Sequence, residues 1–157
     1  MDNPRLRKLS EENLNAVISR ARRAFLPPPP ETVSEWADHN RILTREESPT
    51  AGLWNTDNTP YLREIMNTFT DKTTQITTVL KATQLGFTEA AVNICGYTID
   101  RSPCRIMYVM PDEELAKDFS VDRLQKALKN TPGIAAKIES ADRSKALVVR
   151  FPGGFIR

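Results

Sequence analysis

Two kinds of hydrophobic pattern alternate along the second half of the chain. Residues 75–80 (QITTVL) and 105–110 (RIMYVM) are β-branched or apolar runs of strand length, and each precedes a stretch with helical spacing, residues 88–100 and 112–128. Short runs of this kind predict strands, whereas apolar residues at every third or fourth position predict amphipathic helices. Alternating strands and helices predict an α/β fold with a parallel sheet and right-handed crossovers.

The two predicted helices have distinct apolar faces. Asp112 directly follows a proline and is predicted to be the N-cap of the second helix. The apolar positions are Ala91, Ile94, Cys95 and Thr98 in the first helix and Leu115, Phe119, Leu124 and Leu128 in the second.

A third strand is predicted near the end of the sequence. Residues 146–151 (ALVVRF) have the strand pattern and lead into the turn signal Pro152-Gly153-Gly154. Residues 155–157 begin a returning arm, which is not expected to pair because it has only three residues. The pattern therefore predicts an interrupted hairpin and an incomplete domain.

The first 60 residues follow a different organisation. Residues 10–26 predict an amphipathic helix with Ser10 as N-cap, and four consecutive prolines, Pro27 to Pro30, predict a stiff linker after it. Residues 31–59 show no sustained periodicity, and a short helix is predicted to begin at Pro60. We therefore predict two regions, a basic helix with a proline-rich linker over 1–30 and the α/β domain over 31–157.

Composition and charge narrow the class of protein. Hydrophobic residues make up 39% and charged residues 27% of the chain, as expected for a globular domain without a membrane span. The net charge is +2, and residues 1–26 contain six Lys or Arg against three Asp or Glu. A basic surface typical of a stand-alone nucleic-acid binder is not predicted. Cys95 and Cys104 lack the spacing of a metal site and are interpreted as reduced core thiols in the cytoplasm.

The loop between the first strand and its helix is the predicted ligand site, because α/β sheets bind ligands at the carboxyl ends of their strands. It reads Lys81-Ala82-Thr83-Gln84-Leu85-Gly86-Phe87-Thr88. Compared with the phosphate-binding pattern G-x-x-x-x-G-K-[ST], only Gly86 and Thr88 keep their usual types. Phe87 stands where the lysine is usual, and Lys81 stands at the first glycine. A lysine entering the loop can reach the same phosphates from the other side.

This loop resembles the deviant P-loop of tailed-phage terminase large subunits of the lambda-like family, which reads K-S-A-x-x-G-[KY]-[ST]. The segments Thr59–Met66, Tyr108–Pro111, Ala116–Phe119 and Arg150–Gly154 are similar to that family in the same order. The resemblance covers residues 33–157. On its own the loop also fits a plain strand-to-helix connection, and the flanking segments favour the phosphate-binding interpretation.

The resemblance implies a P-loop ATPase of viral DNA packaging that uses ATP and Mg²⁺, with flanking helices and an endonuclease in a further C-terminal part. It implies that Lys81 binds phosphate, that Gly86 allows close backbone approach and that Thr88 binds Mg²⁺. It also implies double-stranded DNA, the portal complex and the small terminase subunit as partners, the last through residues 1–26. Aromatic chemistry adds Tyr61, and after it Trp54, as candidates for stacking on adenine.

The acidic residues of such an ATPase are not found in the predicted domain. Asp112 and Glu113 follow an apolar run, but Pro111 intervenes and Asp112 fits a helix cap, so we expect the magnesium-binding and water-positioning acids beyond Arg157. His39 has no partner at metal-ligand spacing and is assigned no role. Two other functions remain open: a non-catalytic prophage remnant that binds a partner or DNA, and part of a helicase-like translocase.

Overall fold

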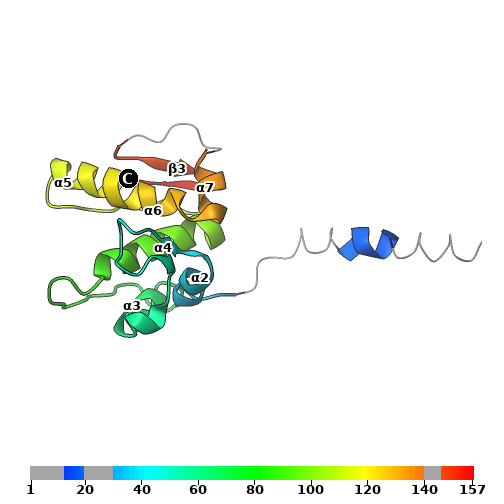
Figure 1. Cartoon of the computed structure of the whole chain (residues 1–157), viewed down its shortest axis with the longest axis horizontal. Helices are drawn as coiled ribbons and strands as arrows, with labels where there is room; N and C mark the ends of the chain where they lie inside the picture. Colours follow the sequence, from blue (N-terminus) through cyan, green and yellow to red (C-terminus); the bar gives the residue numbers. More distant parts are fainter. Residues whose placement is uncertain (1–12, 20–29, 140–145) are drawn as a thin grey trace, which may run out of the picture. The chain divides into compact units, whose positions relative to one another are not determined.

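The computed structural model of the chain describes residues 13–19, 30–139 and 146–157. It divides into two compact units, Met1–Pro30 and Glu31–Arg157 (Figure 1). In the first unit, residues 13–19 are helical, as predicted, and Leu14, Val17 and Ile18 are exposed. The predicted cap Ser10, the rest of that helix and Pro27 to Pro29 lie outside the described residues.

The second unit consists of short helices and very short strands. In chain order its elements are α2 (Val33–Asn40), β1 (Ile42–Leu43), β2 (Gly52–Leu53), the 3₁₀ turn η1 (Thr56–Asn58), α3 (Tyr61–Asn67), α4 (Phe87–Arg101), α5 (Glu113–Asp118), the π-helical segment η2 (Phe119–Gln125), α6 (Lys126–Lys129), α7 (Pro132–Glu139), β3 (Val149–Phe151) and β4 (Gly154–Ile156). Among the described residues, no helix is both long and apolar enough to cross a bilayer.

Helix α4 is the centre of this unit and is contacted by α2, α3, α6 and α7 (Figure 1). Its predicted apolar spacing is confirmed at Cys95 and Thr98, which are buried. The close contact with α2 depends on Gly96, where an added Cβ would lie 2.5 Å from Cη2 of Trp36. An alanine at this position would therefore overpack the contact.

A capping box explains α2, which the periodicity of residues 31–59 did not predict. The Thr32 hydroxyl accepts a hydrogen bond from the Glu35 N–H, and the Glu35 carboxylate accepts one from the Thr32 N–H at 2.8 Å. These two bonds satisfy N–H groups that a helix otherwise leaves unpaired at its first turn. The pKa of Glu35 is lowered chiefly by the Thr32 N–H, and further by the Thr32 hydroxyl, which both donate to its carboxylate.

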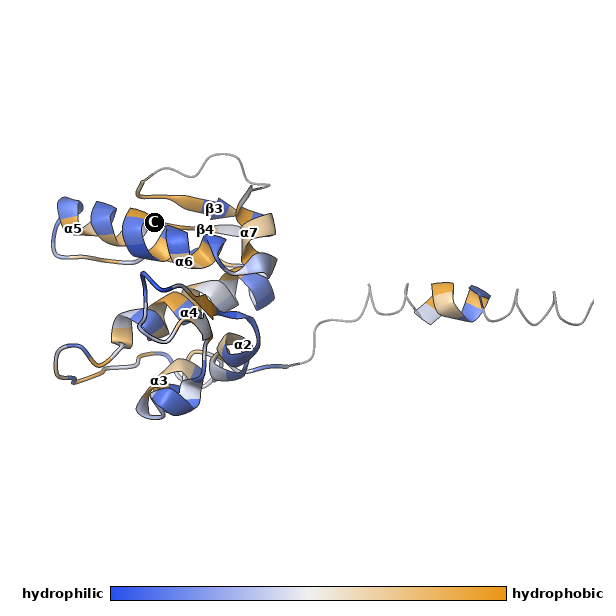
Figure 2. Cartoon of the chain, viewed as in Figure 1, coloured by the Kyte–Doolittle hydropathy of each residue, from blue (hydrophilic) through white to orange (hydrophobic). Residues whose placement is uncertain are grey.

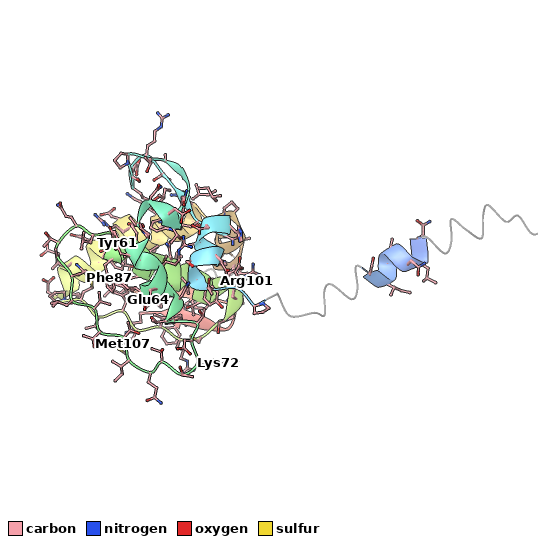
Figure 3. The ribbon with its side chains drawn as sticks, turned by 90° about the horizontal axis from the view of Figure 1, so that it is seen from below. Tyr61, Glu64, Lys72, Phe87, Arg101 and Met107 are labelled. Atoms are coloured by element: carbon pink, nitrogen blue, oxygen red, sulfur yellow. The ribbon has the colours of Figure 1, made fainter. Side chains whose placement is uncertain are left out.

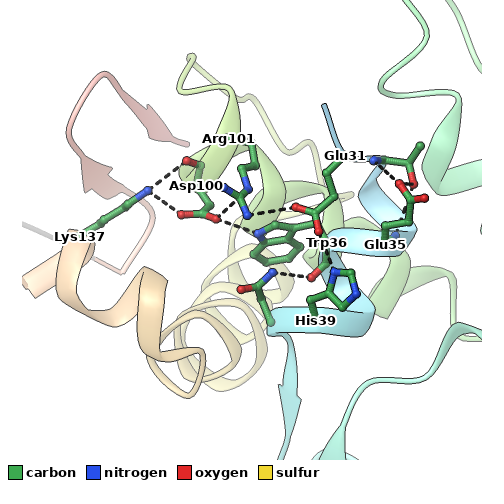
Figure 4. Close-up of polar contacts among 9 residues, drawn as sticks. Glu31, Glu35, Trp36, His39, Asp100, Arg101 and Lys137 are labelled. Carbon is green, nitrogen blue, oxygen red and sulfur yellow. Dashed lines mark hydrogen bonds and ion pairs between the residues drawn. The ribbon is translucent and has the colours of Figure 1, made fainter. Parts of the chain in front are cut away.

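A polar network connects α2, α4 and α7 around Trp36 (Figure 4). Oδ2 of Asp100 accepts a hydrogen bond from the Trp36 indole N–H at 2.9 Å, and Oδ1 accepts one from Lys137 Nζ at 2.6 Å. Arg101 lies between Asp100 and Glu31, with nitrogen–oxygen distances of 3.3 and 3.1 Å. Glu31 also contacts Nδ1 of His39 at 2.8 Å, which gives this histidine a structural partner.

The predicted parallel sheet is confirmed only in part. The described residues form two antiparallel pairs, β1 with β2 and β3 with β4, and one parallel bridge between Ile106 and Ile156. The prediction that the arm over 155–157 would not pair is wrong, because β3 and β4 pair at three positions and the Pro152-Gly153 turn brings them together. The predicted strand over 105–110 is present as an extended segment beside β4. The Ile106 N–H donates to the Phe155 carbonyl at 2.9 Å, and the Tyr108 N–H donates to the carbonyl of Arg157, just after β4, at 2.8 Å.

The predicted strand over 75–80 is not formed. The segment runs between α3 and α4, and no described strand pairs with it (Figures 1 and 2). The side chains of Ile76 and Leu80 are almost fully exposed. An extended segment becomes a strand only when a neighbour satisfies its backbone N–H and C=O groups. Here the β-branched composition is present, but the described residues provide no such neighbour.

Two further predictions about side chains have different outcomes. Asp112 caps α5 as predicted, because its carboxylate accepts the Leu115 N–H at 2.9 Å. Leu124 and Leu128 are buried in the core, whereas Leu115 is about half exposed. The prediction that both cysteines are core thiols is confirmed for Cys95 and is wrong for Cys104, which is free and exposed on the connection that follows α4.

Candidate functional site

The predicted loop over 81–88 is exposed and joins the extended segment to α4. Residues 81–85 are exposed, and Gln84 has a φ of 60°. Gly86 has a φ of 72° and is the N-cap residue of α4. Left-handed backbone is natural for glycine and uncommon for glutamine, and such conformations often mark ligand-binding turns. The loop therefore makes a tight turn directly into the helix.

The start of α4 has backbone N–H groups available to a ligand. Gly86 provides no side-chain cap, and within the described part of the chain no acceptor takes the N–H of Phe87 or Thr88. Helix N-termini carry a partial positive charge, and α4 extends over 15 residues. A helix start with free N–H groups, preceded by a tight glycine turn, is suited to an anion such as a phosphate.

The side chain of Lys81 lies near Phe87, the residue at which the phosphate-binding pattern usually has lysine. Its ammonium group is 5.8 Å from the ring centroid of Phe87, and its nearest hydrogen-bond acceptor is the Ala82 carbonyl at 3.5 Å. The side chain is exposed and has no carboxylate partner among the described residues. A positive charge is thus held at the helix start from the opposite end of the loop.

Helix α3 lies against this loop. A Cβ added to Gly86 would lie 3.3 Å from Cδ1 of Leu62, and Tyr61 next to it is half exposed (Figure 3). The other aromatic candidate, Trp54, is 7% exposed and donates its indole N–H to Thr56 at 3.0 Å. The ring of Tyr61 is therefore open to a ligand, whereas that of Trp54 is part of the core.

Comparisons with known proteins identify the family of the chain. Residues 48–157 match the family profile described as the phage terminase large subunit gpA, ATPase domain. The chain belongs to this family. It is 25% identical over 114 residues to the terminase large subunit of Escherichia phage lambda, covering 73% of the chain and 18% of that protein. It is 23% identical over 122 residues to the terminase large subunit of Enterobacteria phage P21, covering 78% of the chain and 19% of that protein.

The chain therefore spans less than a fifth of the length of these curated terminase subunits. No solved structure gives a significant match. The family assignment thus rests on sequence, and it includes the whole of the loop over 81–88 and α4.

The sequence reasoning missed a charged cluster in this terminase-family domain. Arg41 is 2% exposed, and its guanidinium lies 3.1 Å from Glu89 and 3.3 Å from Glu47. Arg123, from the π-helical segment, approaches the other Glu89 oxygen at 4.0 Å. Glu89 is the third residue of α4, and Arg41 and Arg123 balance its negative charge at the start of this helix. The sequence alone could predict an acidic residue in the first turn of the helix. It could not predict that Arg41, which is 48 residues away, is its partner.

The two acidic residues at the start of α5, Asp112 and Glu113, make contacts within that helix. Asp112 caps the helix, and Glu113 contacts Lys117 at 2.7 Å, a bond that lowers the pKa of Glu113. Among the described residues, no group of three or more His, Cys, Asp or Glu is arranged to hold a metal ion. Burial raises the pKa of the Cys95 thiol to about 12, so this cysteine is a neutral core residue.

Proposed function

We propose that the chain binds ATP with Mg²⁺ at the loop over 81–88 and forms the first part of a P-loop ATPase domain of a DNA-packaging terminase. The observation that carries the proposal is the placement of Lys81 over the Phe87 ring, at a helix start with free N–H groups. Family membership independently supports an ATPase domain.

Each loop residue has a role in this proposal. Lys81 binds the β- and γ-phosphates, Gly86 allows the backbone to approach them, and the N–H groups over residues 82–88 complete the cradle. Thr88, the second residue of α4, offers its hydroxyl to Mg²⁺, which normally takes few protein ligands and is otherwise held by phosphates and water. Tyr61 stacks on adenine.

The proposal assigns ATP binding, but not ATP hydrolysis, to this chain. A P-loop ATPase needs carboxylates for Mg²⁺ and for the attacking water. The acidic residues closest in sequence to the loop or to the 105–110 segment are all engaged: Glu89 with Arg41, Asp112 with the α5 backbone and Glu113 with Lys117. We therefore expect nucleotide binding with negligible turnover by residues 31–157 alone.

The role of a longer protein follows from the family. A terminase large subunit of this kind would couple ATP hydrolysis to translocation of double-stranded DNA through the portal complex in the host cytoplasm, and an endonuclease in its C-terminal part would cut the DNA. Residues 1–26, with their excess of basic side chains, would bind the small terminase subunit.

A thermal-shift titration tests the proposed binding. A ligand that binds only the native state raises the unfolding midpoint, by the equivalent of about 2.7 kcal/mol at 100 times its Kd. We expect ATP with Mg²⁺ to raise the midpoint and adenosine, which lacks phosphates, to raise it far less. No shift at millimolar ATP would contradict the proposal. Equal shifts with ATP and adenosine would show that the loop over 81–88 does not bind the phosphates.

A further inference from the structure

One face of the β3–β4 hairpin carries arginines around an aromatic ring. In the antiparallel register Arg150 lies opposite Phe155, and the parallel pairing of Ile106 with Ile156 places Arg105 on the other side of Phe155. Residues paired across strands share a face of the sheet. The Arg105 guanidinium lies 5.7 Å from the Phe155 ring centroid. Since neighbouring strands are about 4.8 Å apart, Arg150, Phe155 and Arg105 form a row on the order of 10 Å wide, which we call the Arg–Phe–Arg row.

This face of the hairpin is the solvent-facing one. Val149, Phe151 and Ile156 alternate with the row residues and are at most 5% exposed, so the opposite face packs on the core. Arg150 and Arg105 are exposed, and Phe155 is partly exposed. The row is therefore not required for the packing of the hairpin.

The arginines of the row have no acidic partners within the described residues, since neither Arg105 nor Arg150 has a carboxylate within ion-pair distance. Four other arginines of the same unit do have one: Arg41, Arg63, Arg101 and Arg123. Two unpaired arginines about 10 Å apart on one face raise the positive potential over the row, and an anion bound there is attracted to both.

A groove adjoins the row and extends the positive surface. It has a volume of about 450 Å³ and is lined by Arg150, Phe155, Arg157 and Lys117, with apolar residues from 146–148. None of its described lining residues is acidic. Lys117 reaches it from α5, where its ammonium group contacts Glu113. Arginines present planar, forked donors that match phosphate oxygens, and an aromatic ring offers a surface on which a base can stack.

We propose that the Arg–Phe–Arg row and its groove bind nucleic acid, through the phosphodiester backbone and with contact of a base or sugar on Phe155. The surface lies on a different element from the loop over 81–88, so it is a second anion site with its own ligand. In the proposed terminase domain it is the place where the packaging substrate contacts this part of the protein.

Fluorescence anisotropy with the whole 157-residue chain tests this proposal. The probes are a labelled 20-base-pair duplex and a labelled 20-nucleotide oligothymidine, titrated at several salt concentrations. We expect binding that weakens with salt, a loss of about fivefold in affinity for Arg105→Gln and for Arg150→Gln, and a decrease of about one in the salt slope for each variant. Tighter binding of the single strand, with a further loss in Phe155→Ala, would show base stacking, whereas a preference for the duplex would show backbone contact alone. Both results support a nucleic-acid site.

Three control variants make the result decisive. Arg45→Gln removes the same charge from an exposed arginine in the β1–β2 connection and should leave affinity and salt slope unchanged. Lys81→Ala should also leave nucleic-acid binding unchanged, so this surface can fail or succeed independently of the proposed nucleotide site. Lys117→Gln should weaken binding less than either row arginine, because Lys117 already has an acidic partner. The proposal is overturned if the parent chain does not bind either probe at low salt, or if Arg45→Gln weakens binding as much as Arg105→Gln and Arg150→Gln.

Discussion

Similar apolar residues are buried around α4 but exposed to solvent in the extended segments over 75–80 and 105–110. Ile99 on α4 is 1% exposed, whereas Ile76 is 85% exposed. Met107 and Val109 are as open as Ile76, and Figure 3 shows Met107 away from the helices. A helix satisfies its own backbone and needs partners only for one apolar face, whereas a strand also needs a neighbouring strand for its backbone N–H and C=O groups. The same hydrophobic composition thus gives core in one region and open surface in the other.

The polar contacts differ in the same way. Three side chains contact Asp100, near the end of α4: Trp36 from α2, Lys137 from α7 and Arg101 from α4 itself. In the extended segment, the Thr77 hydroxyl contacts only that of Thr68, at 3.3 Å, among the described residues. The region around α4 is therefore fixed by packing and hydrogen bonds together, and the segment over 75–80 by neither.

The largest expected effect comes from one substitution made in both regions. Ile99→Ala should lower the free energy of unfolding by about 2–5 kcal/mol, because it removes buried methyl and methylene groups and leaves a cavity. Ile76→Ala should change it by less than about 0.5 kcal/mol, because the side chain is already in water. Urea unfolding of both variants measures the difference. Equal losses in the two variants would show that the segment over 75–80 is packed in solution.

Asp100→Asn removes a charge from the network around Trp36 while keeping the size of the side chain. Burial acts to raise the pKa of Asp100, but the hydrogen bonds from Lys137 and Trp36 and the nearby positive charges outweigh it, so the pKa is lowered from its ordinary value of 3.8. We expect the variant to lose about 2–3 kcal/mol of stability at pH 7.

The pH dependence of this loss has a defined sign. A lowered pKa in the folded state means that ionised Asp100 stabilises the fold at pH values above its unfolded pKa. That contribution is lost as the pH falls below about 4 and through the folded-state pKa. The stability difference between the parent and Asp100→Asn should therefore shrink between pH 5 and about pH 3, as measured by thermal unfolding. A difference that stays constant over this range would mean that the charge of Asp100 does not stabilise the fold.

Local signals in the sequence predicted the helices better than the sheet. The spacing of Cys95 and Thr98, the cap at Asp112 and the turn at Pro152-Gly153 act within a few residues, and the structure contains all of them. Helix α2 was missed because its apolar spacing is weak, although the pair Thr32 and Glu35 marks its start. The strand over 75–80 depends on partners distant in sequence, which its composition cannot specify.

In the candidate site, too, features with local sequence signals could be predicted, whereas features that depend on tertiary contacts could not. The loop over 81–88 runs directly into α4, as the sequence pattern predicted, but it follows an extended segment and not a strand of a sheet. The ring of Tyr61 is half exposed on α3, and the roles of the loop and of this ring remain predictions. The balance of charge around Glu89 could not be predicted, because Arg41 is 48 residues away and its burial comes from tertiary packing. The exposure of the Arg–Phe–Arg row likewise follows from the register of three segments and from no single motif.

The most direct test of the proposed function is isothermal titration of the parent, Lys81→Ala and Lys72→Ala with ATP and Mg²⁺. Both lysines are exposed and near the extended segment, but only Lys81 lies at the start of α4. Lys81→Ala should weaken nucleotide binding roughly tenfold to a hundredfold, because it removes a charge-assisted contact with phosphate, while the unfolding midpoint without ligand stays unchanged. Lys72→Ala should bind as the parent does. Equal affinity of Lys81→Ala and the parent would contradict the assignment of Lys81 as the phosphate-binding lysine.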